Sequence, residues 1–204
     1  MQRESQTGIS SFLTIGELVR IAILAYILSM DRIFVFSDLH GNGDALKMLL
    51  SRASEESCDH IICAGDLGLD RLGQHRNLLQ GLAIPFSMVR GNCDSVWTFS
   101  EAGFSIPPKY TVLNLGDRIV FVTHGDAIPS WYAAPTPLSE KDIFISGHTH
   151  IAFVAQTSTG PIVMNPGSAS SPRDSRPPSY AVVTDREILV KALVSRRVLE
   201  ALTI

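Results

Sequence analysis

Five short apolar runs rich in β-branched residues recur along the chain, at 33–36, 60–63, 86–89, 119–122 and 143–146. Runs of this kind are typical of buried strands. Between the first two, residues 44–55 carry apolar positions at helical spacing, and a polar stretch around 72–81 predicts a second helix. The resulting β-α-β-α-β order predicts a parallel sheet with right-handed crossovers.

The second half of the chain changes to a hairpin pattern. Residues 110–115 and 118–123 flank Gly116-Asp117, which is a good hairpin turn. Further hairpins are predicted over 153–165, around Thr159-Gly160, and over 180–193, around Asp185-Arg186. A parallel β/α half followed by antiparallel hairpins predicts two packed sheets with helices outside.

Composition narrows the class of protein. A chain of 204 residues is one domain by the usual size rule. A net charge of −3 gives no indication of a basic surface, so specific nucleic-acid binding is not expected. The three cysteines have no paired spacing, which argues against a disulfide framework and favours a cytoplasmic protein, with Cys58 and Cys63 as small core residues.

Residues 1–29 stand apart from the predicted domain at 30–204. The stretch 12–28 is mostly apolar, but Glu17 and Arg20 interrupt it, and it is shorter than the ~20 residues of a membrane span, so no transmembrane segment is predicted. Three interpretations stay open: a helix packed on the fold or a partner, a peripheral membrane helix, and a dispensable extension. The sequence favours the last, because Met30 stands just before the first strand.

Polar motifs follow all five predicted strands. They are Asp38-Leu39-His40-Gly41-Asn42, Gly65-Asp66, Gly91-Asn92-Cys93-Asp94, Thr123-His124-Gly125 and Gly147-His148-Thr149-His150. Each motif alone is weak and can be an ordinary turn, but ligands in α/β sheets gather beyond strand carboxyl ends, and five in succession indicate a site. By contrast, Asn165-Pro166-Gly167-Ser168 is first of all a turn, with a supporting role near the site as the second interpretation.

The side chains of these motifs suit a pair of divalent metal ions. They supply four imidazoles, two carboxylates and one amide without thiolate, which favours Mn, Fe or Zn. Two such ions bring four positive charges against two aspartates, and the surplus favours an anionic substrate and a bound hydroxide, as in two-metal phosphoryl hydrolysis.

The ordered motif set resembles the calcineurin-like metallophosphoesterases, and 89–95, 123–125 and 165–168 resemble the YfcE-like small phosphodiesterases in particular. The resemblance covers residues from Met30 onward. It implies an α/β fold, a four-layer α/β/β/α sandwich of two mixed sheets, and a dinuclear centre, often with manganese and alternatively with Fe, Zn or Ni. It also implies a shared hydroxide as nucleophile.

Carried over by position, the resemblance assigns two ligand sets that share Asp66 as a bridge. The first is Asp38, His40, Asp66 and His150, and the second is Asp66, Asn92, His124 and His148. Catalytic roles fall on Asn92, Asp66 and His124. Two positions depart from the pattern: many members have histidine where this chain has Cys93, and others in the subgroup have His-Gly-His where it has His124-Gly125-Asp126.

The predicted function is therefore that of a metal-dependent phosphodiesterase or phosphatase acting on a small-molecule or exposed phosphoester. Two alternatives stay open. One is a phosphomonoesterase for nucleotides or a phosphoprotein, and the other is a binding scaffold such as the retromer subunit that shares the fold. The sequence does not choose between a monomer and a homo-oligomer.

Overall fold

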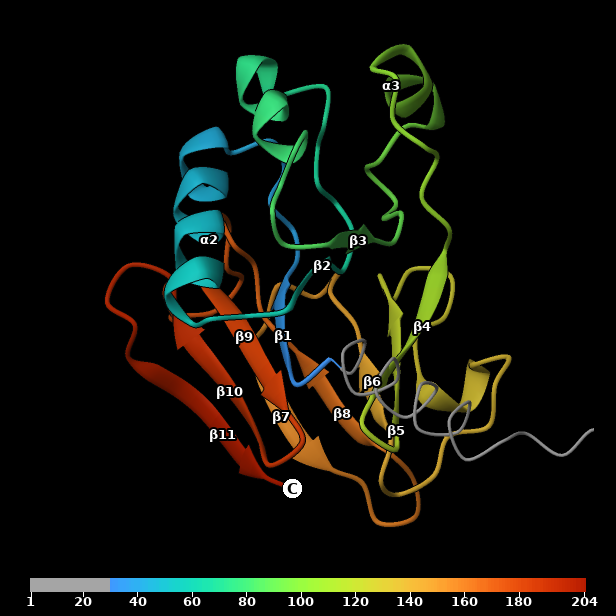
Figure 1. Cartoon of the computed structure of the whole chain (residues 1–204). Coiled ribbons are helices and arrows are strands. Elements are labelled where there is room, and N and C mark those ends of the chain that lie inside the picture. Colours follow the sequence, from blue (N-terminus) through green and yellow to red (C-terminus); the bar gives the residue numbers. More distant parts are fainter. Residues whose placement is uncertain (1–29) are drawn as a thin grey trace, which may run out of the picture.

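The computed structural model describes residues 30–204 and shows two mixed β-sheets (Figure 1). The prediction about residues 1–29 lies outside this part of the chain. The first sheet has the order β11-β10-β9-β1-β2-β3. Its strands are β1 Arg32–Phe36, β2 His60–Cys63, β3 Phe86–Met88, β9 Ser179–Thr184, β10 Glu187–Ala192 and β11 Val198–Thr203. The second sheet has the order β4-β5-β6-β8-β7. Its strands are β4 Tyr110–Leu115, β5 Arg118–Thr123, β6 Ile143–Ile145, β7 Phe153–Gln156 and β8 Ile162–Asn165.

The β-α-β start forms as predicted. Strands β1, β2 and β3 are parallel, and helix α2 (Gly43–Glu55) connects β1 to β2. Asn42 caps α2, because its side-chain oxygen accepts a hydrogen bond from the Ala45 amide. The second predicted helix is wrong in type: Gly73–Leu79 forms a 3₁₀ helix, η1, of which only Leu79 is buried. A segment with so small an apolar face gains little from packing as a longer α-helix.

The three predicted hairpins are confirmed, as β4–β5, β7–β8 and β9–β10. Their placement was not predicted. Strand β9 pairs antiparallel with β1, which makes the first sheet mixed, and β5, β6 and β8 run parallel to one another in the second. Two further elements, strand β11 and the short helix α3 (Val96–Glu101), were missed.

Two cores hold the layers together. The faces of the two sheets enclose one core, with Val35 and Ile62 from the first sheet against Val122 and Ile145 from the second. The other lies between the first sheet and the helices, where Leu46 of α2, Leu79 of η1 and Phe99 of α3 are buried. Cys58 and Cys63 are buried as predicted, and no disulfide joins them. The predicted α/β fold with two packed mixed sheets is confirmed.

Candidate metal centre

The motifs that follow β1 and β2 are joined through their backbones. The Asp38 amide donates to the carbonyl of Gly65 over 3.0 Å, and the His40 amide donates to the carbonyl of Asp66 over 2.9 Å. Because β1 and β2 are parallel neighbours, their carboxyl ends lie at the same edge of the sheet, and these hydrogen bonds hold the two loops in register. The side chains of both motifs are thereby brought to one place.

The backbone at the predicted ligands is unusual. Seven non-glycine residues between 30 and 204 have a positive φ, and five of them are predicted metal ligands: Asp38, His40, Asp66, His148 and His150. This conformation costs on the order of 1–3 kcal/mol per residue and concentrates at functional sites. The side chains of Asp38, His40, Asp66 and His150 meet at one place, so the strained backbone coincides with a cluster of polar groups and supports a functional interpretation.

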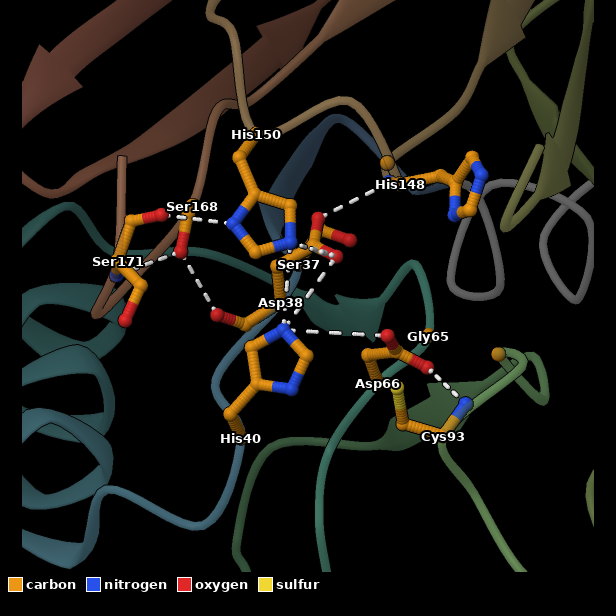
Figure 2. A network of polar contacts seen from close by, with 12 residues as sticks. Ser37, Asp38, His40, Gly65, Asp66, Cys93, His148, His150, Ser168 and Ser171 are labelled. Carbon is orange, nitrogen blue, oxygen red and sulfur yellow. Dashed lines mark hydrogen bonds and ion pairs between the residues drawn. The ribbon is translucent and has the colours of Figure 1, made fainter. Parts of the chain in front are cut away.

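A first cluster forms around Asp38, whose side chain is fully buried (Figure 2). Its Oδ1 atom lies 3.2 Å from His150 Nε2 and 3.9 Å from His40 Nε2. The two imidazoles face each other with their Nε2 atoms 3.3 Å apart. These three side chains come from loops 110 residues apart in the chain, and they present their ligand atoms to one another as a metal site requires.

A second cluster forms around Asp66. Its Oδ2 atom lies 3.4 Å from His124 Nε2 and 3.8 Å from His40 Nε2, so Asp66 stands between both groups of histidines. The His124 Nε2 atom is also 3.2 Å from the side-chain oxygen of Asn92. The structure therefore places Asn92 and His124 beside Asp66, as the predicted second ligand set requires.

His148 is placed differently from the other predicted ligands. Its backbone amide donates to Asp38 Oδ2 over 3.0 Å, and its imidazole points away from Asp38 (Figure 2). The ring contacts the ring of His124 edge-on, with centroids 5.1 Å apart. The structure thus puts His148 next to the second cluster and away from the first, on the side of His124.

Cys93 also reaches this site, although sequence reasoning did not count it as a ligand. Its Sγ atom lies within 4.8 Å of ligand atoms of His40 and Asp66, and its backbone amide donates to Asp66 Oδ1 over 2.8 Å. Partial burial and the nearby Asp66 carboxylate raise the pKa of the Cys93 thiol to about 11. In the protein without metal the thiol is therefore neutral near pH 7, and its sulfur lies among the predicted ligand atoms.

Backbone carbonyls fix the tautomers of the two most buried histidines. His150 Nδ1 lies 2.7 Å from the carbonyl of Ser171, and His124 Nδ1 lies 2.9 Å from the carbonyl of Ala64. Because a carbonyl only accepts, each Nδ1 carries a proton, and Nε2 of the neutral ring then presents a lone pair to a metal ion. This arrangement of a histidine whose second nitrogen is held by a carbonyl is the usual one for metal ligands.

These atoms fit a divalent cation. Asp38 Oδ1 is buried and has no hydrogen-bond partner, although the Nε2 atoms of two imidazoles lie close to it. Burial raises the pKa of Asp38. Burial also opposes ionisation of Asp66, but hydrogen bonds from His124 and the Cys93 amide outweigh it and hold the pKa of Asp66 well below its usual range. Negative oxygens and lone pairs that converge in this way need a shared positive charge, which metal ions supply.

Two glycines next to the ligands allow the loops to approach each other. A Cβ atom at Gly91 would lie 2.0 Å from Asp66 Oδ1, and one at Gly147 would lie 1.9 Å from Ser37 Oγ. No side chain fits at either position without displacing the carboxylates. The glycines of the motifs therefore serve close packing around the candidate site.

A second ring of buried polar side chains positions the ligand loops, and sequence reasoning undervalued it. Asn165 donates to the carbonyl of Gly147 over 2.7 Å and to the Thr149 hydroxyl over 3.0 Å. Ser168 donates to the carbonyl of Asp38 over 2.8 Å. Asp94 accepts from the amides of Gly68 and Gly91. The supporting role that was the second interpretation of Asn165 to Ser168 is the one that the structure shows.

Replacing Asn165 with leucine is expected to loosen the loop that carries His148 and His150. The change leaves the buried Gly147 carbonyl unpaired, which costs about 1–3 kcal/mol of folding free energy. Loss of such a supporting contact typically weakens metal affinity about 10–100-fold. Thermal unfolding and metal titration of Asn165→Leu would measure both effects. The exposed Asn77 is a matched control, and equal behaviour of Asn77→Leu and Asn165→Leu would contradict the positioning role.

The site brings histidines, carboxylates and an amide together at the carboxyl ends of parallel strands, as metal-binding hydrolases do. Comparison with known proteins identifies the family. The family model for the calcineurin-like phosphoesterase superfamily domain matches residues 31–187. The chain belongs to this superfamily, as its motifs predict, and this confirms the predicted class of enzyme.

Two bacterial relatives are similar over most of their length. The chain is 30% identical to the probable metallophosphoesterase YsnB of Bacillus subtilis over 158 residues, which cover 74% of this chain and 83% of YsnB. It is 28% identical to the phosphodiesterase YfcE of Escherichia coli over 189 residues, which cover 86% of this chain and 99% of YfcE.

Solved structures show the same fold. A phosphoesterase structure, YfcE from E. coli, superposes with a TM-score of 0.73 at 23% identity and covers 85% of this chain and 99% of its own. Vacuolar protein sorting 29 from Cryptosporidium parvum superposes with a TM-score of 0.57 at 18% identity, covering 86% and 97%. At these identities the likeness concerns the fold alone.

Proposed function

We propose that this protein is a dinuclear metal-dependent phosphodiesterase that hydrolyses a small or exposed phosphoester. The observation that carries the proposal is the position of Asp66 between the two histidine clusters, with Asp38 buried beside it. A carboxylate in that position can bridge two cations, and two-metal centres are a recurrent solution for displacement at phosphorus.

Each ion has its own set of proposed ligands. Asp38, His40, Asp66 and His150 would hold the first. Asp66, Asn92, His124 and His148 would hold the second, and a rotation of the His148 side chain would bring its ring to the ion. When bound, the ions supply Lewis-acid stabilisation of the phosphoryl oxygens and lower the pKa of water so that it can attack phosphorus near neutral pH.

The chain's own residues would orient the substrate. Asn92 is exposed, so it lies where a phosphate can reach it from solvent, and its amide group can donate to a phosphoryl oxygen. The exposed Arg173 lies beside the loop of His148, where its guanidinium donates to the carbonyl of His148 over 3.4 Å. A positive charge next to this loop favours the approach of an anionic substrate.

The name of one relative supports a diester substrate. YfcE is a phosphodiesterase, and this favours a diester over the alternative monoester of a nucleotide or phosphoprotein. Manganese is the proposed metal and the cytoplasm the proposed location. None of the helices between residues 30 and 204 has the length and hydropathy needed to cross a bilayer.

The non-catalytic scaffold is the second candidate, since the Vps29 structures share the fold. The buried Asp38 Oδ1 atom without a hydrogen bond argues against it, because a scaffold gains nothing from a buried carboxylate oxygen left unsatisfied. The two candidates differ in whether metal and turnover are present.

Protein purified without chelator is expected to contain about two divalent ions per chain and to hydrolyse an aryl phosphodiester when Mn²⁺ is added. Elemental analysis and a panel of phosphodiesters and phosphomonoesters measure both properties. EDTA should remove the ions and the activity together. Fewer than one ion per chain, with no turnover on any ester of the panel, would favour the scaffold.

A further inference from the structure

The outer face of the second sheet carries exposed apolar side chains. Along β4, Leu113 and Leu115 point into the core between the sheets, so the alternating residues point outward. Of these, Tyr110 is 40% exposed and Val112 is 41% exposed. Both residues lie on a six-residue strand without a charged side chain, at the edge of the sheet.

Deeper in the same face lies a row of stacked aromatic rings. The ring of Tyr110 stacks on Phe121 with centroids 5.2 Å apart, and Phe121 stacks on Phe144 at 5.7 Å. Phe121 is fully buried and Phe144 is 3% exposed. Neither belongs to the core between the sheets or to the core under the helices. The outer face is therefore a third apolar layer.

Within residues 30–204 no α-helix covers this layer. Helices α2 and α3 and the 3₁₀ helix η1 all contribute to the core over the first sheet (Figure 1). The connection from β5 to the parallel β6 must cross the outer face, since the other sheet occupies the inner one. That connection contains only the three-residue 3₁₀ helix η2 (Trp131–Ala133).

We propose that the segment 12–28 of the same chain forms a helix that docks on this outer face. Its apolar residues recur at alternating steps of three and four, at Phe12, Ile15, Val19, Ala22 and Tyr26. Ser10, Thr14, Glu17 and Arg20 lie on the opposite side of the first half, whereas residues 21–28 are apolar on every side. Such a helix would have one polar side over its first half and apolar surface that needs cover along its whole length.

The attachment point of the segment 12–28 and its length both suit docking on the outer face of the second sheet. The segment joins the domain at Met30, which packs against the core between the sheets. As a helix, residues 12–28 would span about 25 Å, and a six-residue strand such as β4 spans about 20 Å. The sequence alone favours a dispensable extension, but the apolar sheet face reverses that preference. The proposal is independent of the proposed function.

Hydrogen exchange on the full-length protein tests the docked helix directly. Amides of residues 12–28 are expected to exchange at least 100-fold more slowly than in an unstructured chain. Protection should be independent of protein concentration and should not require lipid. Free-chain exchange rates would overturn the proposal. Protection that appears only at high concentration, or only with anionic vesicles, would assign the segment to a second copy or a membrane surface instead.

Two valines of similar exposure provide the matched variants. Val112→Asp places a charge on the proposed docking face, and Val198→Asp places one on β11 of the first sheet, where Val198 is 47% exposed. Val112→Asp is expected to lower the Tm by about 5 °C and to release the protection of residues 12–28, whereas Val198→Asp changes neither. Unchanged protection in Val112→Asp would overturn the proposal.

A second pair probes the segment itself. Val19→Asp on the apolar side is expected to release protection and lower the Tm, while Thr14→Asp, which adds the same charge on the polar side, is not. The double variant Val19→Asp/Val112→Asp should lose less stability than the sum of the single losses, because the two residues belong to one interface. Additive losses would contradict a shared interface.

Discussion

Asp66→Asn is expected to abolish phosphoesterase activity and to reduce metal content below two ions per chain. Asp66 Oδ2 lies 3.8 Å from His40 Nε2 and 3.4 Å from His124 Nε2, so one oxygen serves both clusters. A neutral amide cannot supply the negative charge that a bridge between two cations requires. Turnover of an aryl phosphodiester with added Mn²⁺, together with elemental analysis, measures both losses.

The fold of this variant is expected to survive with a modest loss of stability. Removing the charge of Asp66 relieves its repulsion with Asp38, but it also weakens the contacts with His124 and the Cys93 amide that hold the pKa of Asp66 low, so the Tm without metal near pH 7 should fall by a few degrees. Asp185→Asn, at an exposed position in the β9–β10 turn, is the control for loss of one carboxylate. Near-normal turnover of Asp66→Asn with two ions still bound would rule out the proposed centre.

The unmodified enzyme is expected to hydrolyse aryl phosphodiesters far faster than alkyl ones. Many members of the superfamily have histidine at the position of Cys93, where it helps to protonate the leaving group. Here a thiol takes that position, and a thiol is a weak hydrogen-bond donor. General acid catalysis typically contributes ~10²–10⁴-fold, so poor leaving groups should lose most of that factor.

A series of diesters with graded leaving-group pKa measures this dependence, and two variants locate its cause. Cys93→His should flatten the dependence if the imidazole reaches the leaving oxygen, whereas Cys93→Ser should leave it steep. Equal rates on aryl and alkyl diesters in the unmodified protein would show that another acid, such as the neighbouring Asp94, protonates the leaving group.

The five strands that precede the polar motifs could be predicted, because their evidence is local. A buried strand needs a short run of β-branched residues, and each run is followed by its own ligands. The same holds for α2 with its Asn42 cap and for the hairpin at Gly116-Asp117. In each case a few neighbouring residues contain the whole signal.

One strand and one strand pairing that depend on the assembled sheet were missed. Strand β11 is mostly exposed and is held by pairing with β10, so its sequence shows only a weak alternation. Strand β9 lies beside β1, although Val35 and Ala181 are far apart in the chain. Such pairings depend on the twist and register of whole sheets, which no local pattern contains.

The candidate site shows the same contrast between local and long-range information. The sequence by itself determined which side chains gather, since the type of each ligand and its position at a strand end can both be recognised from neighbouring residues. Only the tertiary structure decided how they are aimed. The positive φ at Asp38 and His150, the carbonyl that fixes the His150 tautomer, and the hydrogen bond from Ser168 to a residue 130 positions away all need the assembled loops. A strained backbone persists only where surrounding contacts hold it, and those contacts exist only in the folded chain.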